Sequence, residues 1–378
     1  MLKTNNKKIF IFSSVSESLI LFRKELIEEL NIKGFSIYAI SPNLNQNNFY
    51  TKSLCKMNVK LINIPLIGAK ISPIRDILIV LILLFHFVWH RPKYILSYNL
   101  KPIVFGNLLA YLLNIKNRFI IVTGIGYFFL DENKDKLISK LVKFFYSLSL
   151  KTSSKIFFQN SDDKQLFIKL FKIPDEKTIL INGSGVNLDF YKESALPEKI
   201  NFLLIARLIK SKGIIEYLEA ARTIKNKYPE VEFHLVGFYE NNIDKIDKEK
   251  ISKMVDLNIV KFHGKTDDVR PFINACSTYV LPSYREGTPR TVLEAMSIGR
   301  PIITTNVPGC KETVIENFNG YLIEPQSVRS LVDSINKVLK LDRESLIMMA
   351  KNSRKLAEEK YDVHKVNSII IQNLEKNA

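Results

Sequence analysis

Two glutamates, Glu286 and Glu294, flank the expected start of a helix in the segment LPSYREGTPRTVLEAMSIG at residues 281–299. Thr288 suits the N-cap of that helix, and Pro289 suits its first helical position, where a missing N–H removes no hydrogen bond. The N–H groups and the dipole at a helix N-terminus favour negative charge. The segment therefore predicts an anion site, where the two carboxylates can bind different hydroxyl groups of one extended ligand.

A second segment, FLLIARLIKSKG at residues 202–213, places two cations after a buried strand. Arg207 and Lys212 lie in the loop before a helix, and Gly213 permits a close approach of the backbone. A guanidinium can bind phosphate oxygens in a bidentate manner, and two fixed cations can neutralise a diphosphate leaving group. An exposed basic loop without a ligand is the alternative interpretation.

Short β-branched runs alternate with longer helical stretches along the chain, which predicts right-handed βαβ units and parallel sheets. In the first half, we expect strands at 8–12, 36–40, 59–64, 94–97, 119–123 and 155–158, with helices at 17–30, 73–89, 102–113, 136–150 and 162–171. In the second half, we expect strands at 201–205, 232–236, 259–262, 278–281 and 301–304, helices at 213–225 and around 292–297, and three helical stretches after about residue 326.

This pattern predicts an α/β protein with two Rossmann-like, doubly wound domains facing each other across a cleft. We expect residues 1–190 to bind an acceptor and residues 191–359 to bind a nucleotide sugar, with a C-terminal helix at about 360–378 packing back on the first domain. The boundary falls in the polar stretch YKESALPEK, where the charge balance also changes. Ligands of such sheets bind beyond the carboxyl ends of the strands.

The charge is unevenly distributed. The chain has 378 residues, with 55 Lys+Arg, 38 Asp+Glu and a net charge of +17. Residues 1–190 hold 26 basic and 13 acidic residues, a net of +13, which leaves 29 and 25, a net of +4, for the rest. An anionic partner is expected, namely a nucleic acid, an acidic membrane or a phosphorylated small molecule. AT-rich codon usage would also explain the lysine content, and no nucleic-acid-binding motif is present.

The three cysteines are scattered, which predicts neither disulfides nor a metal site and favours a reducing, cytoplasmic setting. The N-terminus has too short an apolar run for a secretory signal. The longest apolar stretch, Ile77–Trp89, is shorter than the roughly 20 residues of a spanning helix, so we expect a buried core helix, with an interfacial helix as the alternative. Residues 135–150 mix lysines with Leu, Val and Phe, typical either of an acidic membrane surface or of a core-packed helix with a solvated lysine face.

The two segments together resemble the family 4 retaining glycosyltransferases, which have the GT-B fold. Further similar segments are TGIGYFF at 123–129, FFQNSDD at 157–163, GSGVN at 183–187, LPSYREGTPR at 281–290 and VPGC at 307–310. They resemble the bacterial branch that builds capsule, exopolysaccharide and O-antigen (lipopolysaccharide) repeats. That branch includes the enzyme that adds N-acetylgalactosamine to undecaprenyl-diphospho-bacillosamine.

The resemblance implies roles for individual residues. Glu286 would lie near the anomeric centre of the donor sugar, and Arg207 and Lys212 would hold its diphosphate, which makes these three the expected catalytic residues. The further donor-binding residues would be Glu294 at the ribose, Gly287 and Thr288 at the phosphates, Phe262 and Gly237 near the base, and Asn160 and Ser14 from the N-terminal domain. Lys101 and Tyr127, expected at strand ends, would bind the acceptor.

The sequence departs from the family pattern at two places. Ser13–Ser16 replace a glycine pair common in relatives, and Thr123–Gly126 stand where many relatives carry a histidine, so no histidine is assigned to catalysis. We expect no metal and no cofactor, because neither an Asp-x-Asp at a strand end nor a cluster with ligand spacing occurs.

The resemblance implies transfer of an N-acetylhexosamine (GalNAc or GlcNAc) from a UDP-sugar to an undecaprenyl-diphosphate-linked saccharide, at the inner face of the bacterial cytoplasmic membrane. A non-catalytic sugar-nucleotide binder and a transferase using a UDP-uronic acid or GDP-sugar remain as alternatives.

Overall fold

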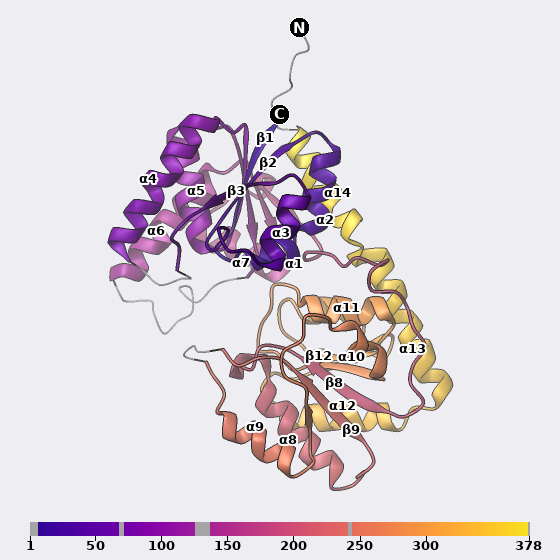
Figure 1. Cartoon of the computed structure of the whole chain (residues 1–378). Helices are drawn as coiled ribbons and strands as arrows, with labels where there is room; N and C mark the ends of the chain where they lie inside the picture. Colours follow the sequence, from indigo (N-terminus) through magenta and orange to yellow (C-terminus); the bar gives the residue numbers. More distant parts are fainter. Residues whose placement is uncertain (1–6, 68–71, 125–136, 241–243, 377–378) are drawn as a thin grey trace. The chain divides into compact units, whose positions relative to one another are not determined.

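The chain folds into two α/β units, each built on a parallel sheet. A computed structural model describes residues 7–67, 72–124, 137–240 and 244–376 (Figure 1). Unit 1 comprises Met1–Ser184 and His364–Ala378, and unit 2 comprises Gly185–Val363. The prediction of two Rossmann-like parallel-sheet domains is confirmed.

Unit 1 contains a seven-stranded sheet in the order β3-β2-β1-β4-β5-β6-β7. Its strands are β1 (Lys8–Phe12), β2 (Ser36–Ser41), β3 (Lys60–Asn63), β4 (Tyr94–Tyr98), β5 (Asn117–Val122), β6 (Lys155–Phe158) and β7 (Thr178–Leu180). Its helices are α1 (Glu17–Leu21), α2 (Lys24–Ile32), α3 (Phe49–Lys56), α4 (Pro73–His90), α5 (Leu100–Leu112), α6 (Leu137–Thr152), α7 (Ser161–Phe171) and α14 (Val363–Lys376).

The two faces of this sheet carry different helices, because successive strand residues point to opposite sides. Ile9 and Ile11 of β1 pack with α1, α2, α3 and α14. Phe10 and Phe12 pack with α4 and part of α5, and the same face continues over β5 and β6 to α6 and α7. Helices α4, α5 and α6 therefore lie over one face of the sheet (Figure 1).

Unit 2 contains a six-stranded sheet in the order β10-β9-β8-β11-β12-β13. Its strands are β8 (Asn201–Ile205), β9 (Glu232–Val236), β10 (Lys261–Phe262), β11 (Thr278–Leu281), β12 (Ile302–Thr305) and β13 (Gly320–Ile323). Its helices are α8 (Ile214–Lys225), α9 (Lys248–Asp256), α10 (Arg270–Ala275), α11 (Arg290–Ile298), α12 (Val328–Leu339) and α13 (Arg343–Leu356). One face packs against α8, α9 and α12, and the other against α10 and α11.

The structure differs from the sequence predictions at several places. Strands β7 and β13 and helices α3, α9 and α10 were not predicted. The helix expected at 17–30 is two helices, α1 and α2, which meet near Phe22 and Arg23. The units divide between Ser184 and Gly185, a few residues before the boundary expected at 190/191. The stretch after residue 190 packs on unit 2, where the guanidinium of Arg300 donates to the carbonyl oxygens of Ser194 and Ala195 at 2.9 and 3.2 Å.

Helix α4 is not the buried core helix that its composition suggested. Only 17% of its residues are buried, and these are Ile79, Leu83 and Phe87, which recur every four residues on one side. That stripe packs against the sheet, while the apolar side chains on the other side of the helix, such as Ile77, Leu81 and Phe85, are exposed in the part of the chain that the structure describes. Composition alone could not separate a fully buried helix from one that is apolar all round and packed on one side only.

Helix α14 completes the core of unit 1 from the far end of the chain. Ile370 is fully buried among side chains of β1, α2 and α14 itself, as are its neighbours Val366 and Leu374. We expect Ile370→Ala to lower the free energy of unfolding by about 2–5 kcal/mol, because the methyl groups removed leave a cavity. Chemical denaturation of the exposed-site variant Lys365→Ala provides the control, and equal stability of the two variants would contradict the packing of α14 on unit 1.

Candidate functional site

The two segments singled out in the sequence follow neighbouring strands of unit 2. Strand β8 ends at Ile205 and leads into the loop with Arg207 and Lys212, while β11 ends at Leu281 and leads into the loop with Glu286. Strands β8 and β11 pair directly, and the strand order reverses between them. Open α/β sheets bind ligands at this switch point, beyond the carboxyl ends of the strands.

The two loops touch at Gly213. This glycine has φ +71°, and a Cβ added to it would lie 2.0 Å from the carbonyl oxygen of Pro282. A hydrogen bond from the N–H of Tyr284 to the carbonyl oxygen of Ser211, 2.9 Å long, also joins the loops. The backbone contacts therefore fix the two loops against each other, and any larger residue at position 213 would push them apart.

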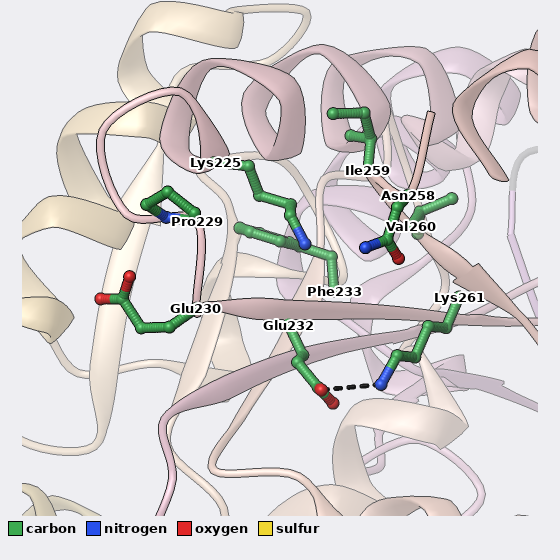
Figure 2. Close-up of a pocket in the computed structure, with 9 residues that line it drawn as sticks. All are labelled: Lys225, Pro229, Glu230, Glu232, Phe233, Asn258, Ile259, Val260 and Lys261. Atoms are coloured by element: carbon green, nitrogen blue, oxygen red, sulfur yellow. Dashed lines mark hydrogen bonds and ion pairs between the residues drawn. The ribbon is translucent and has the colours of Figure 1, made fainter. Parts of the chain in front are cut away.

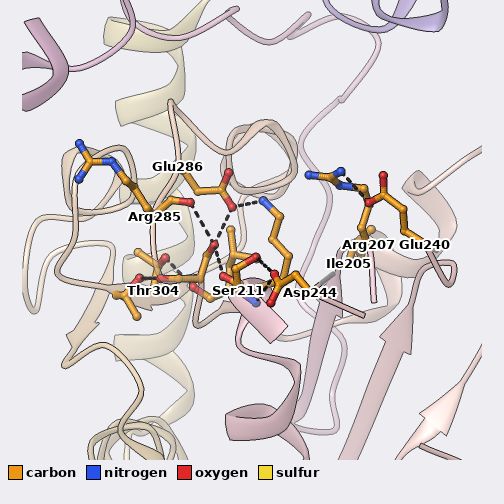
Figure 3. A network of polar contacts seen from close by, with 12 residues as sticks. Ile205, Arg207, Ser211, Glu240, Asp244, Arg285, Glu286 and Thr304 are labelled. Carbon is orange, nitrogen blue, oxygen red and sulfur yellow. Dashed lines mark hydrogen bonds and ion pairs between the residues drawn. The ribbon is translucent and has the colours of Figure 1, made fainter. Parts of the chain in front are cut away.

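Lys212 and Glu286 form an ion pair across this junction. Both side chains are largely buried, with 18% and 14% of their surface exposed. The hydroxyl of Ser283 donates to the same carboxylate oxygen of Glu286 at 2.8 Å. Figure 3 shows the Glu286 carboxylate directed toward the loop that carries Ser211. The structure thus brings together two of the three residues expected to carry catalysis.

Asp244 holds the loop that carries Lys212. Its carboxylate accepts hydrogen bonds from the N–H of Ser211 at 3.0 Å and from the Ser211 hydroxyl, and its carbonyl oxygen accepts from the N–H of Lys210 at 2.9 Å. The sequence reasoning missed Ser211, Ser283 and Asp244. Ser211 and Ser283 stand in the two chosen loops, so their hydroxyls were an available signal, whereas nothing local connects Asp244 with them.

Arg207 lies at the same sheet edge but has a different partner. Its guanidinium donates to Oε2 of Glu240 at 2.7 Å, and about half of its side-chain surface is exposed. The pair lies to one side of the Glu286 contacts in Figure 3. The loop after β8 thus carries two cations, each paired with a carboxylate: Arg207 with Glu240 and Lys212 with Glu286. Cations of this kind can bind the oxygens of a diphosphate.

Glu294 is enclosed by protein rather than open to solvent. Its Oε1 accepts hydrogen bonds from the hydroxyl of Tyr191 at 2.8 Å and from Nε of Arg290 at 3.0 Å. Burial raises the pKa of Glu294 above its ordinary value, although Arg290 opposes the shift. Tyr191 was missed in the sequence because it lies in the stretch interpreted as a domain linker.

The helix after Glu286 starts one residue later than predicted. Helix α11 begins at Arg290, and Pro289 occupies the N-cap, with its carbonyl oxygen accepting from the N–H groups of Val292 and Leu293. The prediction that Thr288 caps the helix is wrong, because its hydroxyl donates to the carbonyl oxygen of Gly287 at 2.9 Å. A Cβ added to Gly309 would lie 2.2 Å from the carbonyl oxygen of Glu286 and 2.7 Å from that of Gly287, so Gly309 packs closely against the turn before the helix.

The residues expected near a nucleotide base, Phe262 and Gly237, lie at the carboxyl ends of β10 and β9. The Gly237 N–H donates to the carbonyl oxygen of Gly264 at 2.9 Å, and a Cβ at Gly237 would meet the Ala206 carbonyl oxygen at 1.9 Å. The Phe262 ring is half-buried and packs edge-on against Tyr239. Both residues therefore share the sheet edge that carries Arg207.

The remaining expected residues belong to unit 1. The Ser14 N–H donates to Oδ1 of Asn99 at 3.2 Å, and Asn160 is the buried N-cap of α7, where its Oδ1 accepts from the Asp163 N–H at 2.8 Å. Lys101 is not at a strand end as predicted, because α5 begins at Leu100 and Lys101 forms its first turn. Its ammonium donates to Asp76 Oδ1 at 2.7 Å. Tyr127 lies outside the described residues.

No group of three or more His, Cys, Asp or Glu side chains that could hold a metal ion occurs within the described ranges. A surface pocket opens at the opposite end of the sheet from Glu286, beside the starts of β9 and β10 (Figure 2). Its lining is Lys225, Pro229, Glu230, Glu232, Phe233, Asn258, Ile259, Val260 and Lys261. Since ligands of this fold bind at the other edge, the pocket does not belong to the candidate site.

Comparison with known proteins places these loops in a family. Residues 188–356 match the model described as "Glycosyl transferases group 1". The chain is 27% identical, over 92% of its length and 93% of the relative's, to N,N'-diacetylbacillosaminyl-diphospho-undecaprenol alpha-1,3-N-acetylgalactosaminyltransferase of Campylobacter jejuni. It is also 27% identical, over 79% of each chain, to UDP-Gal:alpha-D-GlcNAc-diphosphoundecaprenol alpha-1,3-galactosyltransferase of Escherichia coli.

A solved structure supports the fold independently. Anabaena Alr3699/HepE in complex with UDP and glucose superposes with a TM-score of 0.77 at 17% identity, over 98% of this chain and all of that one. At this identity the likeness concerns the fold, and it agrees with the two parallel sheets described above.

We expect Gly213→Ala to destabilise the protein by more than about 2 kcal/mol, because both its positive φ and the contact with Pro282 resist a side chain. Gly264→Ala is the matched control, since Gly264 has φ +70° but no atom within 4 Å of an added Cβ. The control should lose only about 1 kcal/mol, the strain of the backbone conformation itself. Equal losses in thermal unfolding would show that the contact between the loops contributes nothing.

Proposed function

Because this chain is a GT4 glycosyltransferase with the GT-B fold, we propose that it transfers an N-acetylhexosamine from a UDP-sugar to an undecaprenyl-diphosphate-linked saccharide during the synthesis of a surface polysaccharide or glycan. The observation that carries the proposal is the ion pair between Lys212 and Glu286 at the switch point of the unit 2 sheet. It sets a cation and a carboxylate side by side where a ligand of this fold binds.

The cations act on the leaving group. As the bond between the anomeric carbon and the phosphate oxygen breaks, negative charge develops on the diphosphate. Arg207 and Lys212 neutralise this charge, and their loop is already held by Asp244, so little reorganisation is needed at the moment of reaction. Two protein cations at the diphosphate supply the charge that a metal ion would otherwise bring, and we propose transfer without a metal or other cofactor.

The carboxylates act on the sugar and the nucleoside. Glu286 binds hydroxyl groups of the donor sugar beside the reacting carbon, and Glu294 binds the ribose. The backbone N–H groups of Gly287 and Thr288 assist Arg207 and Lys212 at the diphosphate. The base lies against the main chain near Phe262 and Gly237. Hydrogen bonds from Tyr191 and Arg290 occupy one oxygen of Glu294 and fix the carboxylate in place. A carboxylate fixed in this way binds a diol without first losing side-chain entropy.

The transfer needs no separate base, because the leaving phosphate accepts the proton of the acceptor hydroxyl. The acceptor hydroxyl attacks the anomeric carbon from the face that the diphosphate leaves, so the configuration is retained. The new bond joins that carbon to the acceptor oxygen, and the hydroxyl proton passes to the departing phosphate oxygen. We also propose that Ser14 and Asn160 contribute to donor binding and that Lys101 and Tyr127 bind the acceptor.

Two relatives support a lipid-linked acceptor, because the names of both include an undecaprenyl diphosphate. The charge of residues 1–190, 26 basic against 13 acidic, suits a phosphorylated lipid. We accordingly propose that the protein works in the cytoplasm as a peripheral protein on the inner face of the bacterial cytoplasmic membrane.

Replacing Glu286 tests catalysis. We expect Glu286→Gln to lower kcat by roughly a hundredfold or more, because the neutral amide does not stabilise positive charge developing on the sugar. The control is Glu219→Gln, a partly exposed carboxylate of α8 that pairs with Arg222, which should retain full activity. Unchanged turnover in Glu286→Gln, measured as UDP release with a lipid-linked acceptor, would contradict the catalytic role of Glu286. No turnover in the unaltered protein would leave a sugar-nucleotide binder instead of this enzyme.

A thermal-shift panel tests the donor. We expect UDP-sugars to raise the Tm in the presence and absence of EDTA, whereas GDP- and dTDP-sugars do not. A ligand at a hundred times its Kd stabilises the folded state by roughly 2.7 kcal/mol. Lys212→Ala should abolish the shift, while Lys210→Ala, a neighbouring exposed lysine of the same turn, should keep it. Stabilisation by GDP-sugars alone would contradict the assignment of UDP, and a shift lost in EDTA would contradict metal independence.

A further inference from the structure

Helix α4 presents a continuous apolar surface to solvent. Its outward residues Ile74, Ile77, Leu81, Phe85, Val88 and Trp89 are exposed, Trp89 by 73%. The opposite side of the helix is firmly packed, with Phe87 in ring contact with Phe10 of β1 at 5.1 Å between centroids. An apolar face of this size that is exposed to solvent marks an interaction site.

Helix α6, on the same face of the sheet, continues this surface. Leu141, Phe144, Phe145 and Leu148 are exposed there, while Tyr146 and Leu150 face the core. Both α4 and α6 contact α5, which lies between them (Figure 1). We call the exposed apolar residues of these two helices the outer face of unit 1.

The charges along the outer face are mainly positive. Along the described residues of α4 and α6, the basic residues are Arg75, Lys140, Lys143 and Lys151, and the one acidic residue is Asp76. The Asp76 carboxylate is already paired with Lys101 at 2.7 Å. Apolar side chains bordered by uncompensated lysine and arginine are the pattern of a helix that lies in the interface of an acidic bilayer.

Helix α4 is long and apolar enough to cross a membrane by length and composition, but its packing favours a different placement. Its 18 residues span about 27 Å, slightly less than the roughly 30 Å of a hydrocarbon core. Removing it from the sheet would also expose Ile79, Leu83 and Phe87 together with the strand residues that they cover. The helix can meet lipid with its outer side while its inner side stays on the protein.

We infer that the outer face of unit 1 inserts into the headgroup region of an acidic lipid bilayer, with α4 and α6 lying parallel to the membrane plane. This inference deepens the proposed function and rests on it in one respect, namely that a lipid-linked acceptor brings the enzyme to a bilayer. It specifies which surface meets the membrane and that apolar insertion, in addition to charge, holds it there.

The single tryptophan of the chain makes the contact directly measurable. Trp89 stacks on Phe85 at the exposed end of α4. Vesicles of phosphatidylcholine mixed with an equal amount of phosphatidylglycerol should shift the Trp89 emission to shorter wavelength, and brominated phosphatidylcholine in the same vesicles should quench it. Vesicles of phosphatidylcholine alone should do so much less. An emission spectrum unchanged by the acidic vesicles would overturn the inference.

A pair of variants separates apolar insertion from general charge attraction. Leu81→Gln/Phe85→Gln should weaken partitioning to acidic vesicles by roughly tenfold or more in flotation, because each glutamine must be desolvated. Ile347→Gln/Met348→Gln is the control, since it removes two exposed apolar side chains of α13 in unit 2. Equal flotation of both variants would overturn the inference. So would a dimer in lipid-free solution that the α4 variant converts to monomers and the α13 variant does not, because that result would assign the face to a second copy of the chain.

Two further readouts keep the outcomes distinct. The α4 variant should retain its thermal shift with UDP-sugar, which shows that it is folded. It should also transfer sugar normally to a short-chain, water-soluble prenyl-diphosphate acceptor while losing activity on acceptor embedded in vesicles. Wild-type protein that binds acidic vesicles but transfers no sugar to either acceptor would refute the proposed function and leave the docking surface intact.

Discussion

The candidate site depends on one steric constraint, the contact between the β8 and β11 loops at Gly213. The absence of a side chain allows the Pro282 carbonyl oxygen to approach, and this brings the Ser211 carbonyl within reach of the Tyr284 N–H. Lys212 and Glu286 meet only because the two loops are held in this way. The parallel pairing of β8 with β11 brings the two loops to the same edge of the sheet, and Gly213 lets them come into contact.

The residues around the site are of two kinds, namely those expected to contact the ligand and those that orient them. Asp244, Ser283 and Tyr191 each donate or accept hydrogen bonds that orient one of the expected functional side chains or its loop. None of them was assigned a role from the sequence, although Ser283 stands in one of the two loops. Because such partners restrict the rotamers of Lys212, Glu286 and Glu294, they determine geometry more than chemistry.

Much of the fold could be predicted from the sequence, because hydrophobic periodicity and the positions of glycine and proline report local structure. Eleven of the thirteen strands and the start of α8 after Gly213 were predicted from short β-branched runs and glycine positions, whereas the edge strands β7 and β13 were not. The predictions at Thr288, Lys101 and α4 were wrong for a common reason. The start of a helix and the exposure of its faces depend on which other elements pack against it. Glu240 and Asp244 are distant in the sequence from the residues that they contact, and only the sheet brings them to the site.

The route of the chain has a consequence for how the protein is made. Unit 2 is an insertion within unit 1, since the chain leaves unit 1 at Ser184 and returns at His364. During synthesis, β8 to α13 are therefore complete before α14 has left the ribosome. Until then, the face of the first sheet formed by Ile9, Ile11 and Leu96 lacks Val366, Ile370 and Leu374. The domain encoded first is thus the last to close, and its unfinished side is a surface that chaperones would meet on the nascent chain.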